Sequence, residues 1–272
     1  MQQHKLEKII INTILPVGGF IMIIPLLWAI TTSFKTPAEA MLTPPTIFPN
    51  IWQFSGYVRL FRDLNFLLYL RNTLVLVLFS FAGVFVNMFA GFGFAKYNFK
   101  HKEKFFYLVL ATMMIPGQVT MIPNFMVINA MGLVNTFAGM IIPGLASGFS
   151  IFLFRQFIET VPDDLLNAAK IDGAGDIRAF FSVLVPVCKP IIAVQMILAF
   201  IGSWNSFLWP LIIANSYRLF PLGVGLQLLS GQNNIDFPLQ MAGSVVMIVP
   251  VIIVFLLFQK HIIEGFTTSG LK

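Results

Sequence analysis

Long stretches without a charged side chain constrain this sequence more than any other feature. Five such runs occupy 9–34, 72–95, 105–154, 190–217 and 237–259. A helix needs about 20 apolar residues to cross a hydrocarbon core roughly 30 Å thick. Four runs are therefore long enough for one span each, and 105–154 is long enough for two spans joined around 116–135. The sequence predicts an all-α integral membrane fold in a single transmembrane domain over 1–272, with six transmembrane helices near 9–33, 72–95, 105–122, 136–154, 190–214 and 239–259.

Composition excludes the soluble classes of protein. Hydrophobic residues make up 57% of the chain and charged residues 10%, whereas a soluble domain carries about 25% charged residues. Too few charged side chains remain to cover a soluble surface, which excludes a cytosolic enzyme, a nucleic-acid binder and a secreted module. A single cysteine leaves no disulfide framework and no multi-cysteine metal site.

The distribution of Lys and Arg predicts the orientation of the spans. Six spans place both termini on one side of the membrane, and twelve of the 17 Lys and Arg residues fall on that side. Because basic residues concentrate in cytoplasmic loops, we expect both termini in the cytoplasm. The segment 161–189, between the fourth and fifth spans, is then a cytoplasmic loop.

The predicted spans contain no Asp, Glu, Lys, Arg or His. Proton-coupled carriers and pumps place such groups at membrane depth, and an intramembrane protease needs a His base or an HExxH helix. The sequence also lacks the GxxxxGK[ST] phosphate loop, so the chain does not itself hydrolyse ATP. A transporter built on it therefore takes its energy from a partner. A self-sufficient secondary carrier that uses backbone carbonyls and hydroxyls stays as an alternative.

The cytoplasmic loop begins with the pattern of a short helix. Pro162 suits a first helical turn, and Asp163 and Asp164 suit the positive end of the helix dipole. Gly173 and Gly175 are expected to end this helix, because glycine adopts the left-handed cap conformation at little cost. Apolar and small residues at helical spacing give the helix one face: Leu165, Leu166, Ala168 and Ala169.

A second short helix follows in the same loop. Asp176 is expected to cap a helix from 177 to about 185, which Pro186 ends or bends. The two helices would form a helix–turn–helix at the inner membrane face with small residues exposed. Small residues permit the close approach of another surface, so the pattern predicts a docking element.

This loop resembles the EAA loop of ABC-importer permeases, a coupling helix that docks on an ATPase. The residues that carry the resemblance are Asn167, Ala168, Ala169, Gly173, Val183, Val185 and Pro186. The string Ala-Ala-Lys-Ile-Asp-Gly-Ala is similar to the carbohydrate-uptake branch, specifically the maltose system's second, shorter permease. Segments 33–35, 72–74, 152–157, 204–210 and 265–272 also fit that branch, so the resemblance covers most of the chain. The departure is Asn167, where the family usually has Glu.

The resemblance implies a passive half-pore in a bacterial-type plasma (inner) membrane. A homologous second permease subunit, two cytoplasmic ATPase subunits that hold ATP and Mg, and an extracytoplasmic substrate-binding protein would complete the importer. The ATPase-coupling residues it implies are Leu165, Asn167, Ala168, Ala169, Asp172, Gly173 and Pro186. The implied cargo is a sugar or oligosaccharide; glycerol phosphate, a polyol or an acidic oligosaccharide stays as an alternative.

Polar residues in and between the spans are candidates for the substrate pathway. They are Asn87, Gln118, Asn124, Asn129, Gln195, Asn205 and Ser206. Sugar hydroxyls need amide partners, and sugar ring faces stack on aromatic rings, so Gln118, Asn124, Trp204, Asn205 and Trp209 are the predicted contacts. The alternatives are hydrogen bonding between helices and Trp anchoring at the membrane interface. The Gly144–Gly148 spacing predicts tight helix packing.

Overall fold

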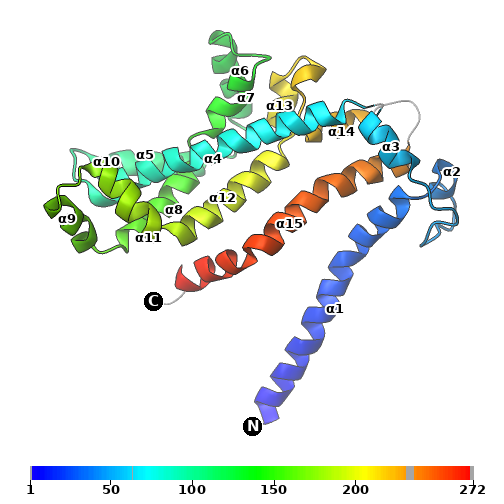
Figure 1. The fold of residues 1–272 in the computed structure, drawn as a ribbon, viewed down its shortest axis with the longest axis horizontal. Helices are drawn as coiled ribbons and strands as arrows, with labels where there is room; N and C mark the ends of the chain where they lie inside the picture. Colours follow the sequence, from blue (N-terminus) through cyan, green and yellow to red (C-terminus); the bar gives the residue numbers. More distant parts are fainter. Residues whose placement is uncertain (1, 63, 231–235, 270–272) are drawn as a thin grey trace. The chain divides into compact units, whose positions relative to one another are not determined.

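The computed structural model describes residues 2–62, 64–230 and 236–269, and over these ranges it contains helices and no strand (Figure 1). The predicted all-α fold is confirmed. The α-helices are α1 (Gln2–Ser33), α2 (Pro37–Ala40), α3 (Ser55–Arg62), α4 (Phe66–Lys96), α5 (Lys102–Met113), α6 (Met121–Ala130), α7 (Phe137–Ile141), α8 (Gly148–Glu159), α9 (Asp163–Ile171), α10 (Asp176–Ala179), α11 (Val185–Val187), α12 (Lys189–Trp204), α13 (Leu208–Ile213), α14 (Leu222–Ser230) and α15 (Phe237–Ser269). Two 3-10 turns, η1 (Ile142–Gly144) and η3 (Tyr217–Leu219), and a π-helical segment, η2 (Phe180–Leu184), complete the set.

Three helices are long and apolar enough to cross a membrane: Asn12–Ser33, Phe66–Lys96 and Phe237–Gln259. Two bent pairs raise the number to five if each counts as one span. They are Phe137–Gly144 with Gly148–Glu159, bent by 43°, and Asp176–Val187 with Lys189–Trp204, bent by 84°. In the described part of the chain the structure thus supports three to five spans, and the six-span topology stays a prediction.

The helix expected over 105–122 is shorter than the sequence indicated. It ends at Met113, so α5 is roughly 18 Å long. Pro116 follows, and the residue before a proline is disfavoured in the helical conformation. Absence of charge therefore marked an apolar segment correctly but did not mark the end of its helix.

The chain divides into two compact units, of which the first contains 1–67 and 225–250. Its loop after α1 has a polar centre of its own. The Glu39 carboxylate, 6% exposed, accepts hydrogen bonds from Thr46 Oγ1 at 3.0 Å and from the Asn50 amide at 2.8 Å. Lys35, 2% exposed, donates to the Thr46 carbonyl and lies 4.7 Å from the ring centre of Trp28. This loop is therefore a folded element and not an extended connection.

The second unit contains 68–224 and 251–272, and glycines let its helices approach closely. A Cβ atom on Gly91 of α4 would lie 2.6 Å from the Phe154 Cβ of α8. A Cβ atom on Gly148 of α8 would lie 2.6 Å from the Thr112 Oγ1 of α5. The tight packing predicted for Gly144 and Gly148 therefore holds at Gly148. Gly144 has open space where a Cβ would be.

Candidate functional site: the coupling loop and a polar cavity

The first helix of the loop 161–189 forms where the sequence predicted it. Pro162 (φ −59°) precedes α9, Asp163 and Asp164 occupy its first turn, and Asp172 ends it. Gly173 adopts φ +82°, a left-handed conformation that glycine reaches without a Cβ penalty. In Figure 1, α9 and α10 lie side by side at one end of the second unit.

The face predicted for α9 is wrong in one respect. Leu166 is buried at 7% exposure and Ala169 packs partly buried against the same apolar core. Leu165 and Ile171 are exposed at 43% and 86%, and Ala168 is exposed as well. The side chains predicted to share one face are therefore divided between an inner side and an outer side. Helical spacing alone does not say which of two adjacent leucines turns inward.

The second helix also differs from its prediction. Gly175 has φ −70° and is the N-cap, so Asp176 is the first helical residue and its side chain does not cap the helix. Helical structure continues through η2 to Val187, and the 84° bend before α12 falls at Cys188. Pro186 lies inside this helical stretch and is exposed, so the bend comes after it.

Lys96, the last residue of α4, fixes the start of α9. Its Nζ donates to the Val161 carbonyl oxygen and to Asp163 Oδ1, both at 2.6 Å. The Lys96 side chain is 9% exposed, whereas that of Asp163 is 73% exposed. The bond to the buried Val161 carbonyl is therefore the better shielded of the two. It connects the loop 161–189 directly to a long apolar helix.

A second polar cluster closes the turn between α9 and α10. The Asp176 carboxylate accepts hydrogen bonds from the Tyr97 hydroxyl and from Lys170, and these contacts lower the pKa of Asp176. Burial, and then the hydrogen bond to Asp176, raise the pKa of Tyr97 to about 12. Asn167 is exposed and lines a cavity of about 160 Å³. Lys96, Tyr97, Lys170 and Asp176 line the same cavity. Asn167, which the resemblance aligns with a Glu, thus shares this cavity with two lysines and with the carboxylates of Asp163 and Asp176.

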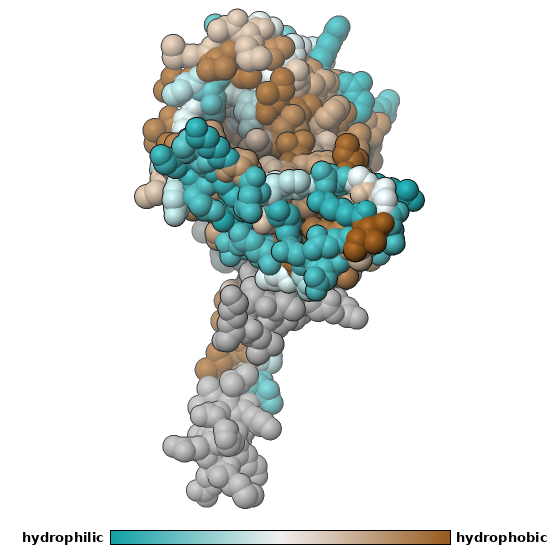
Figure 2. Space-filling model, turned by 90° about the vertical axis from the view of Figure 1, so that its left-hand side faces the viewer, coloured by the Kyte–Doolittle hydropathy of each residue, from teal (hydrophilic) through white to brown (hydrophobic). Residues whose placement is uncertain are grey.

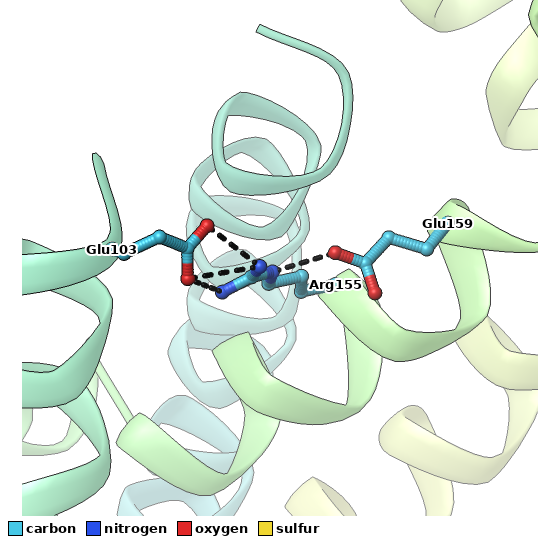
Figure 3. A network of polar contacts seen from close by, with 3 residues as sticks. All are labelled: Glu103, Arg155 and Glu159. Carbon is cyan, nitrogen blue, oxygen red and sulfur yellow. Dashed lines mark hydrogen bonds and ion pairs between the residues drawn. The ribbon is translucent and has the colours of Figure 1, made fainter. Parts of the chain in front are cut away.

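Arg155 joins α8 to α5 close to the loop (Figure 3). Its guanidinium donates to both carboxylate oxygens of Glu103, at 3.1 and 3.4 Å, and to Glu159 at 2.8 Å. It also lies 3.8 Å from the ring centre of Phe106. The Arg155 side chain is only 11% exposed, so the ion pairs and the ring together bury it. The helix that leads into the loop is thereby fixed to its neighbour.

Figure 2 faces the end of the second unit at which α9 and α10 lie. Hydrophilic residues gather on this end, with a small apolar patch among them. The exposed Leu165 and Ile171 belong to this loop. A surface that is mostly polar with a few exposed apolar side chains is suited to contact with another protein.

The five predicted substrate contacts have different surroundings, and their role in binding a sugar stays a prediction. Gln118 and Asn124 are exposed in and after the turn between α5 and α6. Trp204 is buried and stacks on Phe200, with ring centres 5.5 Å apart. The remaining two bond to backbone carbonyls: Asn205 Nδ2 donates to Ile201 at 3.0 Å, and Trp209 Nε1 donates to Gly139 at 3.2 Å.

A cavity of about 380 Å³, with polar side chains in a mainly apolar wall, lies between α4, α8 and α12. Its polar lining residues are Ser80, Asn87, Ser147, Ser150, Gln195 and Ser203. Asn87 has a structural role, because its amide donates to the Leu145 carbonyl at 3.2 Å and accepts from the Ser147 amide at 2.8 Å, across the break before α8. The sequence marked Asn87 and Gln195 as polar residues in apolar runs. It gave no signal for the serines, which are common in membrane helices.

The chain matches one protein family over residues 83–266, the binding-protein-dependent transport system inner membrane component. The chain belongs to this family. The resemblance to ABC-importer permeases inferred from the loop is thereby confirmed, and the family consists of permease subunits. The family description and the several apolar helices agree on a multi-pass inner membrane protein.

Family members with assigned roles align over nearly the whole chain. The arabinooligosaccharides transport system permease protein AraQ of Bacillus subtilis (strain 168) is 34% identical over 99% of this chain and 98% of its own length. The sulfoquinovosyl glycerol transport system permease protein SmoH of Agrobacterium fabrum is 34% identical over 97% and 93%. The sn-glycerol-3-phosphate transport system permease protein UgpE of Rhizobium meliloti is 28% identical over 97% and 98%.

A solved structure shares the fold of this binding-protein-dependent permease. It is a chain from a bacterial ABC transporter involved in the import of the acidic polysaccharide alginate. The TM-score is 0.83, with 96% of this chain and 98% of that chain covered at 23% identity. The aligned region thus includes residues of both units of the chain.

Proposed function

We propose that this chain is one of two permease subunits of an ATP-driven importer for a neutral sugar or oligosaccharide, and that it couples to a cytoplasmic ATPase through the loop 161–189. The observation that carries the proposal is the combination of anchoring and exposure in α9. Lys96 fixes the start of the helix, while Leu165, Ala168 and Ile171 stay exposed on its outer side. A helix that is rigidly held yet offers apolar side chains is suited to transmit the movement of a docked partner.

The proposed topology has six spans with both termini in the cytoplasm. The concentration of Lys and Arg on the side of the termini supports this orientation. It places 161–189 and the Arg155 network on the cytoplasmic side, where an ATPase can reach them. The loop that contains Glu39 then lies outside, accessible to a delivery protein.

The proposed partners are a homologous second permease, two ATPase subunits that bind ATP and Mg, an extracytoplasmic substrate-binding protein and the lipid bilayer. The family description supports a binding protein directly. A chain without a phosphate loop needs the ATPase partner for active transport. This arrangement is favoured over a self-sufficient carrier, because the family match names binding-protein dependence.

The proposed cargo is a neutral saccharide. AraQ and the lactose permease LacG of Rhizobium radiobacter are named for neutral sugars, whereas SmoH and UgpE are named for sulfoquinovosyl glycerol and glycerol 3-phosphate, which carry a sulfonate and a phosphate. None of the residues lining the 380 Å³ cavity, all of which lie in the described part of the chain, is charged. A phosphate or carboxylate group would find no cation there, which favours neutral cargo over anionic cargo.

The proposal is tested by purifying the chain from its native membrane in mild detergent and identifying the proteins that accompany it. We expect a second permease and a Walker-motif ATPase. The informative substitution is Ala168→Trp, because Ala168 is exposed, whereas bulk at the half-buried Ala169 would disturb packing. It should release the ATPase and abolish uptake without loss of membrane insertion.

Asn98→Trp, at an exposed position in the α4–α5 connection, is the matched control and should keep the complex intact. Uptake by Ala168→Trp at the unchanged rate would refute the coupling role.

A further inference from the structure

Gln195 differs from the other polar groups that line the 380 Å³ cavity. It lies in α12 and is 2% exposed. In the described part of the chain, two buried side-chain atoms have no hydrogen-bond partner, Gln195 Nε2 and Thr32 Oγ1. Of these two residues, Gln195 lines the cavity. A buried amide donor without a partner is unfavourable, and such a group in a native structure calls for an explanation, of which a bound molecule that completes the hydrogen bond is one.

The orientation of the Gln195 amide is fixed from one side. The Ser150 hydroxyl of α8 donates to Gln195 Oε1 at 2.9 Å. The oxygen is thereby occupied, and the two hydrogens on Nε2 are left to donate. An amide held in this way is prepared to bind an acceptor without rotating first, so little ordering is lost when a ligand arrives.

The cavity suits a sugar better than an ion. Its volume of about 380 Å³ falls within the range of roughly 300–1,000 Å³ that small-molecule sites occupy. Its wall combines hydroxyl groups with the half-exposed ring of Phe149. Two glycines, Gly144 and Gly202, also line it, and a Cβ built on either would have no other atom within 4 Å. A saccharide presents hydroxyl groups on its rim and an apolar ring face, and this wall offers a partner for each.

We infer that the cavity between α4, α8 and α12 is a subsite for one sugar unit, in which Gln195 Nε2 donates a hydrogen bond to a hydroxyl oxygen of the transported saccharide. Ser150 is the positioning residue that holds the amide, and Phe149 borders the ring face. This inference rests on the proposed function, because it takes the cargo to be a neutral saccharide. It also adds to that function, because it assigns part of the recognition to this permease itself.

The test uses lactose, a neutral disaccharide for which the similar permease LacG of Rhizobium radiobacter is named. Lactose is compared with its monodeoxy analogues in proteoliposomes that contain the complete transporter and its binding protein. Each sugar is measured with wild-type chain, with Gln195→Met and with Thr32→Val. Gln195→Met keeps the length of the side chain but removes the donor, together with the oxygen that accepts from Ser150. Thr32→Val removes the other buried unpaired atom and is the control. The measured quantity is the ratio of lactose uptake to analogue uptake. The binding protein contributes equally to this ratio in every variant, so its own preference cancels when the ratio for a variant is divided by the ratio for wild type.

We expect wild type to transport lactose about tenfold more efficiently than the analogue that lacks the recognised hydroxyl, which is the effect of one good hydrogen bond. Gln195→Met should lose this discrimination by transporting lactose less efficiently, while Thr32→Val should keep it. Ser150→Ala should raise the KM for lactose and leave the rate at saturation unchanged. Gln195→Met and Ser150→Ala both break the hydrogen bond between Ser150 and Gln195, so the two complexes should have similar thermal stability. A structural role of the Nε2 donor would make Gln195→Met clearly less stable than Ser150→Ala.

Two results would overturn the inference, and they are distinguishable. If wild type imports lactose but Gln195→Met discriminates as wild type does, the subsite is wrong and the proposed function stands. If wild type imports none of lactose, arabinotriose and diacetylchitobiose but imports sn-glycerol 3-phosphate, the neutral cargo is wrong and the subsite fails with it. ATPase activity stimulated by the binding protein confirms in each case that the complex is assembled.

Discussion

Replacing Lys96 with Met should loosen α9 from the transmembrane helix that holds it. The substitution removes two hydrogen bonds at once, one to the Val161 carbonyl and one to Asp163, both at 2.6 Å. A hydrogen bond from a charged donor contributes about 1.5–3 kcal/mol, and the Val161 carbonyl is left buried without its donor. The bond to Asp163 adds at most about 1 kcal/mol, since that carboxylate is 73% exposed and screened by solvent.

The expected consequence is local and measurable by amide hydrogen exchange. A loss of about 1.5–3 kcal/mol corresponds to a roughly tenfold to hundredfold faster exchange of the first amides of α9. Asp163→Asn should change the same amides by less than about fivefold. Binding-protein-stimulated ATPase activity should become uncoupled from uptake in Lys96→Met, because the docked helix no longer pulls on α4. Lys100→Met, which removes an exposed lysine nearby, is the control and should behave as wild type.

Equal effects of Lys96→Met and Asp163→Asn would refute this reasoning. They would mean that the exposed ion pair, and not the shielded bond to Val161, fixes the helix. Unchanged exchange in Lys96→Met would refute it more directly, because the anchoring of α9 would then come from apolar packing alone.

Three further predictions follow from the geometry of the second unit. Gly91→Ala should destabilise the complex by about 1–3 kcal/mol in thermal unfolding, because the added Cβ meets α8. Gly93→Ala is the control and should not destabilise it, since open space surrounds that position. Equal melting temperatures of the two variants would contradict this. Gly173→Ala should weaken ATPase docking and lower stability by about 1 kcal/mol, because φ is +82° there; a stabilised variant would show that the turn relaxes. The pKa of Tyr97, raised to about 12, means that its contribution to stability is intact below pH 10 and is lost between about pH 10 and 12. Asp176→Asn should lower the pKa of Tyr97 but leave it above 10, since burial is the larger cause of the shift. Tyrosinate absorbance of the variant and of wild type measures the change. An unchanged titration would exclude the hydrogen bond between Tyr97 and Asp176.

Local features of the loop 161–189 could be predicted from the sequence because they depend on neighbours in the chain. The helix start at Pro162 and the left-handed turn at Gly173 are of this kind. The inward turn of Leu166 in place of Leu165 is not, because it depends on where the apolar core lies relative to the helix. The same limit explains Asp176, whose carboxylate bonds to Tyr97 and Lys170 and does not cap its own helix.

The cavity shows where sequence reasoning about membrane helices ends. Asn87 and Gln195 are equally conspicuous as amides in apolar runs. Only the structure separates them, because Asn87 bonds across a helix break on both its donor and its acceptor, while Gln195 keeps its donor unused. Trp204 and Trp209 suit a sugar site by residue type, and their contact with a sugar stays a prediction: Trp204 is buried, and Trp209 Nε1 donates to the Gly139 carbonyl.

The contacts of Arg155 have a mechanical consequence for the stroke of an importer. Helices α5 and α8 are joined at two separate points, by the Arg155–Glu103 ion pair and by the close approach of Gly148 to Thr112. Contacts at two separate points resist both sliding and pivoting of one helix on the other, so we expect the two helices to move together. Because α8 leads directly into the loop with α9, a push on that loop is applied to both helices together and not absorbed as slippage between them.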